Sequence, residues 1–149
     1  MSMEICPTFT APTTAGQTIS LPDGQLTVLY FYPKDNTPGC TTEAQGFRDQ
    51  HAAFAAAGAR IIGVSRDSIK SHENFKAKFE LPFELISDPE ETVCNLFAVM
   101  KLKNMYGKQV TGIERSTFVI DGAGNILRQW RGLKVPGHVE EVLAFVNTL

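Results

Sequence analysis

The chain has 149 residues and a mass of 16.4 kDa, with 43% hydrophobic and 20% charged residues, which predicts one globular domain over residues 1–149 and excludes a disordered chain. Fourteen Lys and Arg against sixteen Asp and Glu give a formal charge of -2, so the overall charge favours neither nucleic acid nor an anionic membrane as a partner. The longest apolar run, residues 28–32, is far shorter than the roughly 20 residues of a membrane span, and the N-terminus lacks a secretory pattern. We therefore expect a cytoplasmic protein.

The chain alternates predicted strands and helices. Residues 26–32 are rich in β-branched and aromatic side chains without alternation, which is typical of a central strand buried on both faces. The other predicted strands are residues 59–65, 83–86, 116–121 and 126–131, with the last two forming a hairpin. The predicted helices are residues 41–57, 68–79, 88–97 and 139–146.

This order of elements predicts an α/β fold, with a mixed central sheet and helices on both faces. In the third helix Asp88 is the expected N-cap, Pro89 the first helical residue, and Cys94 a residue of the helix itself. Residues 102–112, with two glycines, are expected to form a long surface loop.

The three cysteines, Cys6, Cys40 and Cys94, are odd in number, with no C-x-x-C pair and no Cys/His cluster. This spacing argues against a disulfide scaffold and against structural zinc. Cys40 lies in the predicted first turn of a helix, where free backbone N–H groups and the helix dipole favour a thiolate. Cys40 is therefore a candidate reactive thiol, with an inert buried cysteine as the alternative.

Several separated motifs share a family resemblance. Residues 33–40, PKDNTPGC, have the form P-x-x-x-T-x-x-C, and Arg115 begins the stretch RSTFVID. These motifs resemble the peroxiredoxins, and TPGCTTEA with ERSTFVID is similar to the bacterioferritin comigratory protein or peroxiredoxin Q subgroup. The likeness continues through IIGVSRD, SDPEETVC and DGAGNI, so it covers nearly the whole chain. It implies a thioredoxin-like fold and a thiol-dependent peroxidase for hydrogen peroxide and organic hydroperoxides that needs no metal, flavin or haem.

The resemblance also implies roles for particular residues. Cys40 would be the peroxidatic nucleophile, whose thiolate attacks a peroxide oxygen and becomes a sulfenic acid. Thr37 would bond the thiolate and the peroxide, and Arg115 would stabilise both the thiolate and the charge that develops on the leaving oxygen. The plainer alternatives are a loop threonine bonded to backbone and a surface arginine paired with Glu114.

Two further positions match the family. Pro33 would stiffen the loop and shield the thiolate from water, although it also simply ends a strand. Glu43 would orient the arginine, although an acid in the first turn of a helix is favourable by itself.

The chain departs from the subgroup at Gln45, where many members carry a resolving cysteine. We therefore expect a one-cysteine cycle in which thioredoxin, glutaredoxin or a small thiol reduces the Cys40 sulfenic acid. The alternative is a two-cysteine cycle with Cys94 as the resolving residue, but the apolar pattern around Cys94 favours a buried core position. Cys6 is a weaker candidate still. The subgroup resemblance implies a monomer.

Two rival functions belong to other classes. A non-catalytic binding or holdase module with a thioredoxin fold would not depend on Cys40. A disulfide oxidoreductase would need C-x-x-C, where this chain has Cys40-Thr41-Thr42.

Overall fold

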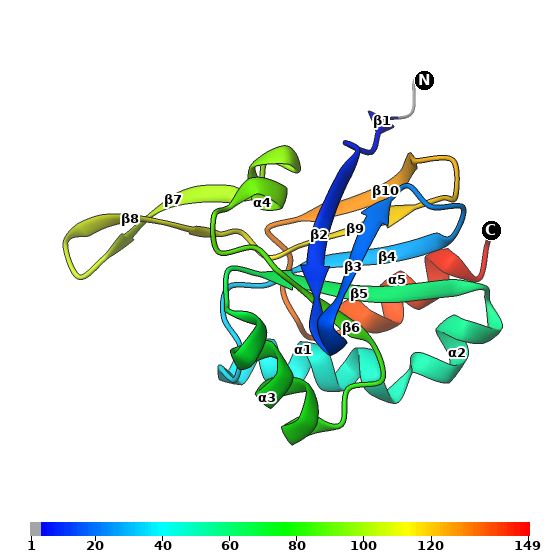
Figure 1. The fold of residues 1–149 in the computed structure, drawn as a ribbon, viewed down its shortest axis with the longest axis horizontal. Helices are drawn as coiled ribbons and strands as arrows, with labels where there is room; N and C mark the ends of the chain where they lie inside the picture. The colour runs from blue at the N-terminus through cyan, green and yellow to red at the C-terminus, as the bar shows by residue number, and fades with distance from the viewer. Residues whose placement is uncertain (1–3) are drawn as a thin grey trace.

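An eight-stranded sheet forms the centre of the molecule (Figure 1). The computed structural model describes residues 4–149 of the chain. From one edge to the other the strands are β1 (Glu4–Ile5), β10 (Asn125–Arg131), β9 (Ser116–Ile120), β4 (Leu26–Phe31), β5 (Ala59–Ser65), β6 (Glu84–Ser87), β2 (Phe9–Thr13) and β3 (Gln17–Leu21). The predicted central strand is confirmed, because β4 has neighbours on both sides and its residues from Thr27 to Phe31 are buried.

The sheet is mixed, as predicted. β4, β5 and β6 are mutually parallel, because each is joined to the next by a helical crossover. β9 runs antiparallel to β4, and β10 runs antiparallel to β9, which confirms the predicted hairpin. The register pairs Phe31, the last residue of β4, with Ser116, the first residue of β9.

Helices cover both faces of the sheet, but unequally (Figure 1). One face carries α1 (Pro38–Asp49), α2 (His51–Ala56), α3 (Ile69–Phe79) and α5 (His138–Val146), whereas α4 (Thr92–Leu96) is the one α-helix of residues 4–149 on the other face. Alternate residues of β4 contact different layers, since Val28 and Tyr30 pack with the first group whereas Leu29 and Phe31 pack with Cys94 of α4. Among residues 4–149, no helix is long and apolar enough to cross a membrane.

The helix predicted over residues 41–57 differs from the observed one at its start and its middle. It begins at Pro38, whose fixed φ and missing N–H suit the first helical position, after the extended residue Thr37. It is also interrupted at Gln50, where ψ is 8°, so that α1 and α2 are separate helices. The alanine-rich sequence contains no glycine or proline at that point that would have indicated the break.

The helix predicted from Asp88 is shorter than expected. Glu91 adopts a left-handed conformation with φ of 64°, so α4 begins only at Thr92, and the N-cap prediction for Asp88 is wrong. The Asp88 carboxylate nevertheless accepts hydrogen bonds from the backbone N–H groups of Val93 and Cys94, at 3.1 and 2.8 Å. Asp88 therefore satisfies first-turn donors from outside the helix.

The surface loop predicted over residues 102–112 is wrong. These residues form a projecting two-stranded antiparallel hairpin, β7 (Met100–Met105) and β8 (Lys108–Ile113), whose strands pair only with each other among the described strands (Figure 1). Tyr106 and Gly107 form its turn, both with positive φ, as a type I′ hairpin turn requires. Most of β8 is exposed, so the sequence lacks the apolar and polar alternation that normally predicts a strand.

Candidate active site

Strand register brings Arg115 to the loop that precedes Cys40. Ser116 pairs with Phe31, the last residue of β4. Arg115 precedes Ser116, and because the two strands are antiparallel it lies just beyond the end of β4. The chain leaves β4 there and enters the loop of residues 32–37, which leads into α1. Two segments separated by 75 residues thus meet at one end of the central strand pair.

Cys40 lies in the first turn of α1 and Glu43 in the second, not in the first turn as the sequence indicated for Glu43, and the two side chains point to the same side. Cys40 is the third residue of the helix, and Glu43 follows three positions later, so their side chains are neighbours on the helix surface. Both are buried, with Cys40 2% exposed and Glu43 0% exposed. The first-turn placement predicted for Cys40 is confirmed.

The Arg115 guanidinium contacts both residues. Its Nη2 donates to Cys40 Sγ at 3.4 Å, and its Nη1 donates to Glu43 Oε1 at 2.8 Å. Burial alone would lower the pKa of Arg115, but the charges of Glu43 and Cys40 outweigh burial and raise it. A fixed positive charge therefore lies against the sulfur, and the pairing of Arg115 with Glu114 that sequence left open is replaced by a pairing with Glu43.

Glu43 lies in an environment that disfavours its charged form. Burial raises the pKa of Glu43 to about 7, against the opposing effect of Arg115. Among the described residues, Glu43 Oε2 and the Tyr30 hydroxyl are buried without hydrogen-bond partners. Burial and then the Glu43 charge raise the pKa of Tyr30, whose ring stacks on Phe47 with 4.7 Å between centroids. Nothing in the local sequence singles out Tyr30, because a tyrosine is ordinary in an apolar strand.

The loop before α1 carries Pro33 and Thr37. Pro33 lies two residues after the end of β4 and is half-buried, whereas Thr37 immediately precedes Pro38, the first residue of the helix. The Thr37 hydroxyl donates to the Lys34 carbonyl at 2.9 Å, which is the backbone bonding that the sequence left open for it. Its contact with a peroxide, and the shielding role of Pro33, stay predictions.

Gly39 also contributes to the site, although the sequence alone did not single it out. A Cβ at this position would lie 3.2 Å from Arg115 Nη2, closer than most such contacts allow. The missing side chain thus leaves room for the guanidinium beside the sulfur. The only indication in the sequence was the glycine adjacent to Cys40.

The other two cysteines lie in the opposite core layer. Cys94 is 0% exposed and packs with Phe31 and Val93, which confirms the expectation of a buried core position. Burial, reinforced by a hydrogen bond with Asp88, raises the pKa of the Cys94 thiol far above its usual range. Burial likewise raises the pKa of Cys6 to about 11.

One cluster in the described residues could offer ligand atoms to a metal ion. Asp35, Asp67 and His72 bring a ligand atom each within 4.8 Å of one another. Both ring nitrogens of His72 and both carboxylate oxygens of Asp35 are, however, hydrogen-bonded to protein groups. His72 and Asp35 are therefore saturated by the chain itself.

Comparison with known proteins shows which family the chain belongs to. The model of the AhpC/TSA family matches residues 3–129. The chain belongs to the AhpC/TSA family. Peroxiredoxin Bcp of Xanthomonas campestris is 56% identical over 121 residues, covering 81% of this chain and 76% of the relative. Peroxiredoxin Bcp of Bacillus subtilis is 54% identical over 130 residues, covering 86% and 83%.

Solved structures agree with this assignment. The bacterioferritin comigratory protein of Xanthomonas campestris, described by its alkyl peroxide reduction activity, superposes with a TM-score of 0.89 at 48% identity, covering 94% of this chain and 90% of that one. A peroxiredoxin Q variant from Xylella fastidiosa gives 0.90 at 42% identity, covering 99% and 98%. The resemblance inferred from motifs is confirmed: this AhpC/TSA member is a thioredoxin-like peroxiredoxin of the Bcp or peroxiredoxin Q type, and a thiol-dependent peroxidase.

Proposed function

We propose that this peroxiredoxin reduces hydroperoxides with Cys40 as its nucleophile. The supporting observation is the contact of Arg115 with the Cys40 sulfur at 3.4 Å, in the first turn of α1. A guanidinium and a helix N-terminus both favour a thiolate, which is the reactive form of cysteine. Pro33 and Thr37, in the loop that leads into α1, complete the proposed site, and Glu43 holds the arginine.

The chemistry balances without a cofactor. The Cys40 thiolate attacks one oxygen of ROOH, an S–O bond forms, the O–O bond breaks, and the leaving alkoxide or hydroxide takes a proton. Sulfur is oxidised by two electrons and the peroxide is reduced to an alcohol or water. Arg115 stabilises the negative charge as it moves from sulfur to the leaving oxygen.

Both hydrogen peroxide and organic hydroperoxides are proposed substrates. The alkyl peroxide reduction activity of the Xanthomonas campestris relative, at 48% identity, supports the organic class. The described contacts of Cys40 involve only its own helix, the core and Arg115, and they discriminate against neither class.

An external thiol is the proposed reductant, in a one-cysteine cycle. A thiol attacks the sulfenic sulfur and releases water, and a second thiol then reduces the mixed disulfide and restores Cys40. Gln45 cannot form a disulfide, and Cys94 packs in the core layer on the other face of the sheet, which disfavours direct bridging. Thioredoxin, glutaredoxin or a small thiol would serve, and a single copy of the chain suffices.

The deciding experiment compares Cys40→Ser with Cys94→Ser. We expect Cys40→Ser to lose peroxide consumption while keeping its fold, because the serine hydroxyl stays protonated at neutral pH. Cys94→Ser should turn over like wild type with thioredoxin as the donor. Substantial activity in Cys40→Ser would refute the nucleophile. Lost turnover in Cys94→Ser, together with a Cys40–Cys94 linked peptide in the oxidised wild type, would establish the two-cysteine alternative.

A further inference from the structure

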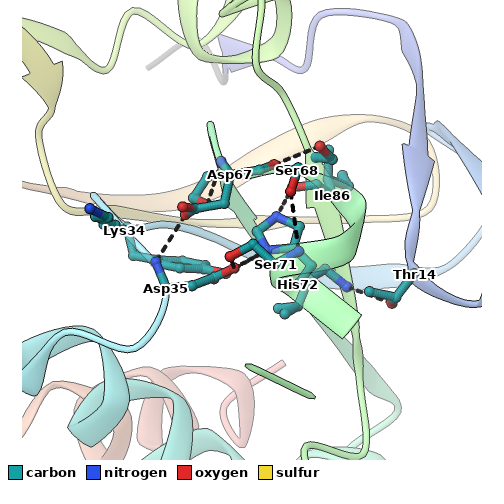
Figure 2. Close-up of polar contacts among 12 residues, drawn as sticks. Thr14, Lys34, Asp35, Asp67, Ser68, Ser71, His72 and Ile86 are labelled. Carbon is teal, nitrogen blue, oxygen red and sulfur yellow. Dashed lines mark hydrogen bonds and ion pairs between the residues drawn. The ribbon is translucent and has the colours of Figure 1, made fainter. Parts of the chain in front are cut away.

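A buried polar cluster fastens the active-site loop to α3. The Asp35 carboxylate, in the loop between β4 and α1, accepts from Tyr32 at 2.6 Å and from Ser71 at 2.8 Å. Its Oδ2 also lies 2.7 Å from His72 Nδ1, and the His72 side chain is 0% exposed. Figure 2 shows His72 between Asp35 of this loop and Ile86 of β6.

The loop backbone is held at the same residue. The Asp35 N–H donates to Asp67 Oδ2 at 2.9 Å, so the segment between β5 and α3 fixes the main chain of Asp35, while Ser71 and His72 of α3 hold its side chain (Figure 2). Lys34, the preceding residue, provides the carbonyl that accepts from the Thr37 hydroxyl. The position of Thr37 thus depends on a turn whose centre is Asp35.

Hydrogen-bond geometry restricts the protons of this pair. His72 Nε2 lies 2.8 Å from the Ile86 carbonyl, which can only accept, so Nε2 carries a proton. Nδ1 faces a carboxylate oxygen, so one proton is shared between Nδ1 and Oδ2. The pair is neutral as a unit, and every polar atom of His72 has a partner inside the protein.

We propose that Asp35 and His72 are a positioning pair for the peroxidase reaction, holding residues 33–37 so that Pro33 and Thr37 meet the peroxide beside Cys40. The pair acts through the loop and contacts neither Cys40 nor Arg115 in the described hydrogen bonds. The inference rests on the proposed function of Cys40. It assigns a positioning role to two residues that take no direct part in the reaction. The rival interpretation is a structural link that only ties α3 to β6.

The test uses amide isosteres of the two ring nitrogens. In His72→Asn the amide nitrogen takes the place of Nδ1 and keeps the bond to Asp35, whereas in His72→Gln it takes the place of Nε2 and keeps only the bond to Ile86. The readout is the rate of Cys40 oxidation by peroxide divided by its rate of alkylation by iodoacetamide. Alkylation needs the thiolate but no alignment of a peroxide, so this ratio isolates positioning from folding.

We expect the ratio to fall roughly 10- to 100-fold in His72→Gln and much less in His72→Asn, because small misplacements near reacting atoms are costly. Phe75→Leu is the control, since it loosens a buried contact of the same helix and leaves the polar bonds intact. An unchanged ratio in His72→Gln, or an equal fall in Phe75→Leu, overturns the proposal.

A second comparison starts from the loop and applies if His72→Gln does not fold. The side chain of Asp35→Asn can accept from Tyr32 and donate to a neutral His72, so its ratio of oxidation rate to alkylation rate should stay near that of wild type. In Asp35→Ala both bonds are lost, so the ratio should fall. Equal ratios in these two variants would refute the proposed positioning role of Asp35 and His72. A wild type that consumes no peroxide through Cys40 would instead refute the proposed function, and that result is distinguishable because it appears before any variant is made.

Discussion

Cys40 and Cys94 lie on opposite faces of the central sheet. Cys40 of α1 packs with Tyr30 and Phe47, whereas Cys94 of α4 packs with Leu29 and Phe31. Adjacent residues of one strand, Tyr30 and Phe31, thus belong to the two layers that contain the two thiols. A direct disulfide needs the two Cα atoms within about 7 Å, so it would require large unfolding on at least one side.

This separation predicts the products of oxidation without a reductant. One equivalent of peroxide should give a Cys40 sulfenic acid that a dimedone reagent traps, and excess peroxide should carry Cys40 to the sulfinic acid, about 32 Da heavier. Cys6 and Cys94 should stay reduced, because both are buried and burial raises the pKa of each thiol. Peptide mass spectrometry measures all three sites, and oxidation spread equally over them would contradict the prediction.

Arg115→Ala should slow peroxide attack by roughly 100-fold, since one charged donor to the reacting atoms is removed. The variant should also shift the pH profile of Cys40 alkylation toward higher pH. Arg115→Lys keeps a charge but cannot bridge Cys40 and Glu43 with a planar fork, so it should recover activity only in part. Arg128→Ala, on an exposed side chain, is the matched control. If Arg115→Ala reacted with peroxide at the wild-type rate, Arg115 would have no role in the reaction.

Glu43 should make the wild type less stable as pH rises. Its folded pKa of about 7 lies above the ordinary value of 4.5, so the folded protein holds this proton more tightly than the unfolded chain does. The associated stability is complete below pH 4.5 and is lost as pH rises through 7, by up to about 3 kcal/mol. Urea unfolding of wild type and Glu43→Gln across this range measures the difference, and parallel stability curves would contradict the pKa direction.

His138 should give the opposite pH dependence. Burial is the main cause that lowers the pKa of His138 from 6.5 to about 4; Glu141 and Glu140 oppose this shift and Arg115 adds to it, and Nε2 lies 2.8 Å from the Thr117 hydroxyl. The unfolded chain therefore binds this proton first, and stability that is present above pH 6.5 is lost as pH falls through 4. His138→Gln keeps an amide at the Nε2 position and should flatten this acid slope. The prediction is refuted if the variant and wild type lose stability equally between pH 6.5 and 4.

Elements with strong local patterns were predictable from the sequence. Residues 59–65 form the predicted strand because their short apolar segment, residues 61–64, is buried on both faces, as a central strand requires. The β7–β8 hairpin was missed because its side chains are mostly exposed, which removes the alternation that reports a strand. The split of α1 from α2 at Gln50 was missed because helix propensity continues through it.

The site was predictable only in part, because its contacts join distant segments. The first-turn position of Cys40 follows from local sequence, but the meeting of Arg115 with Cys40 follows from strand register, and before the structure only the family resemblance implied it. His72 is completely buried in the structure. Its partner Asp35 is 37 positions away in a loop, and no periodicity connects the two.

The exposed turn of the β7–β8 hairpin offers a place to lengthen the chain. Tyr106 is 99% exposed, and the hairpin strands hydrogen-bond to each other rather than to the central sheet. Since the entropy of closing a loop grows slowly with its length, an epitope tag inserted between Tyr106 and Gly107 would add little strain. A protease that cleaves there would leave two fragments still joined by β7 and β8. The hairpin is thus the natural point for attaching a reporter to this enzyme without altering either terminus.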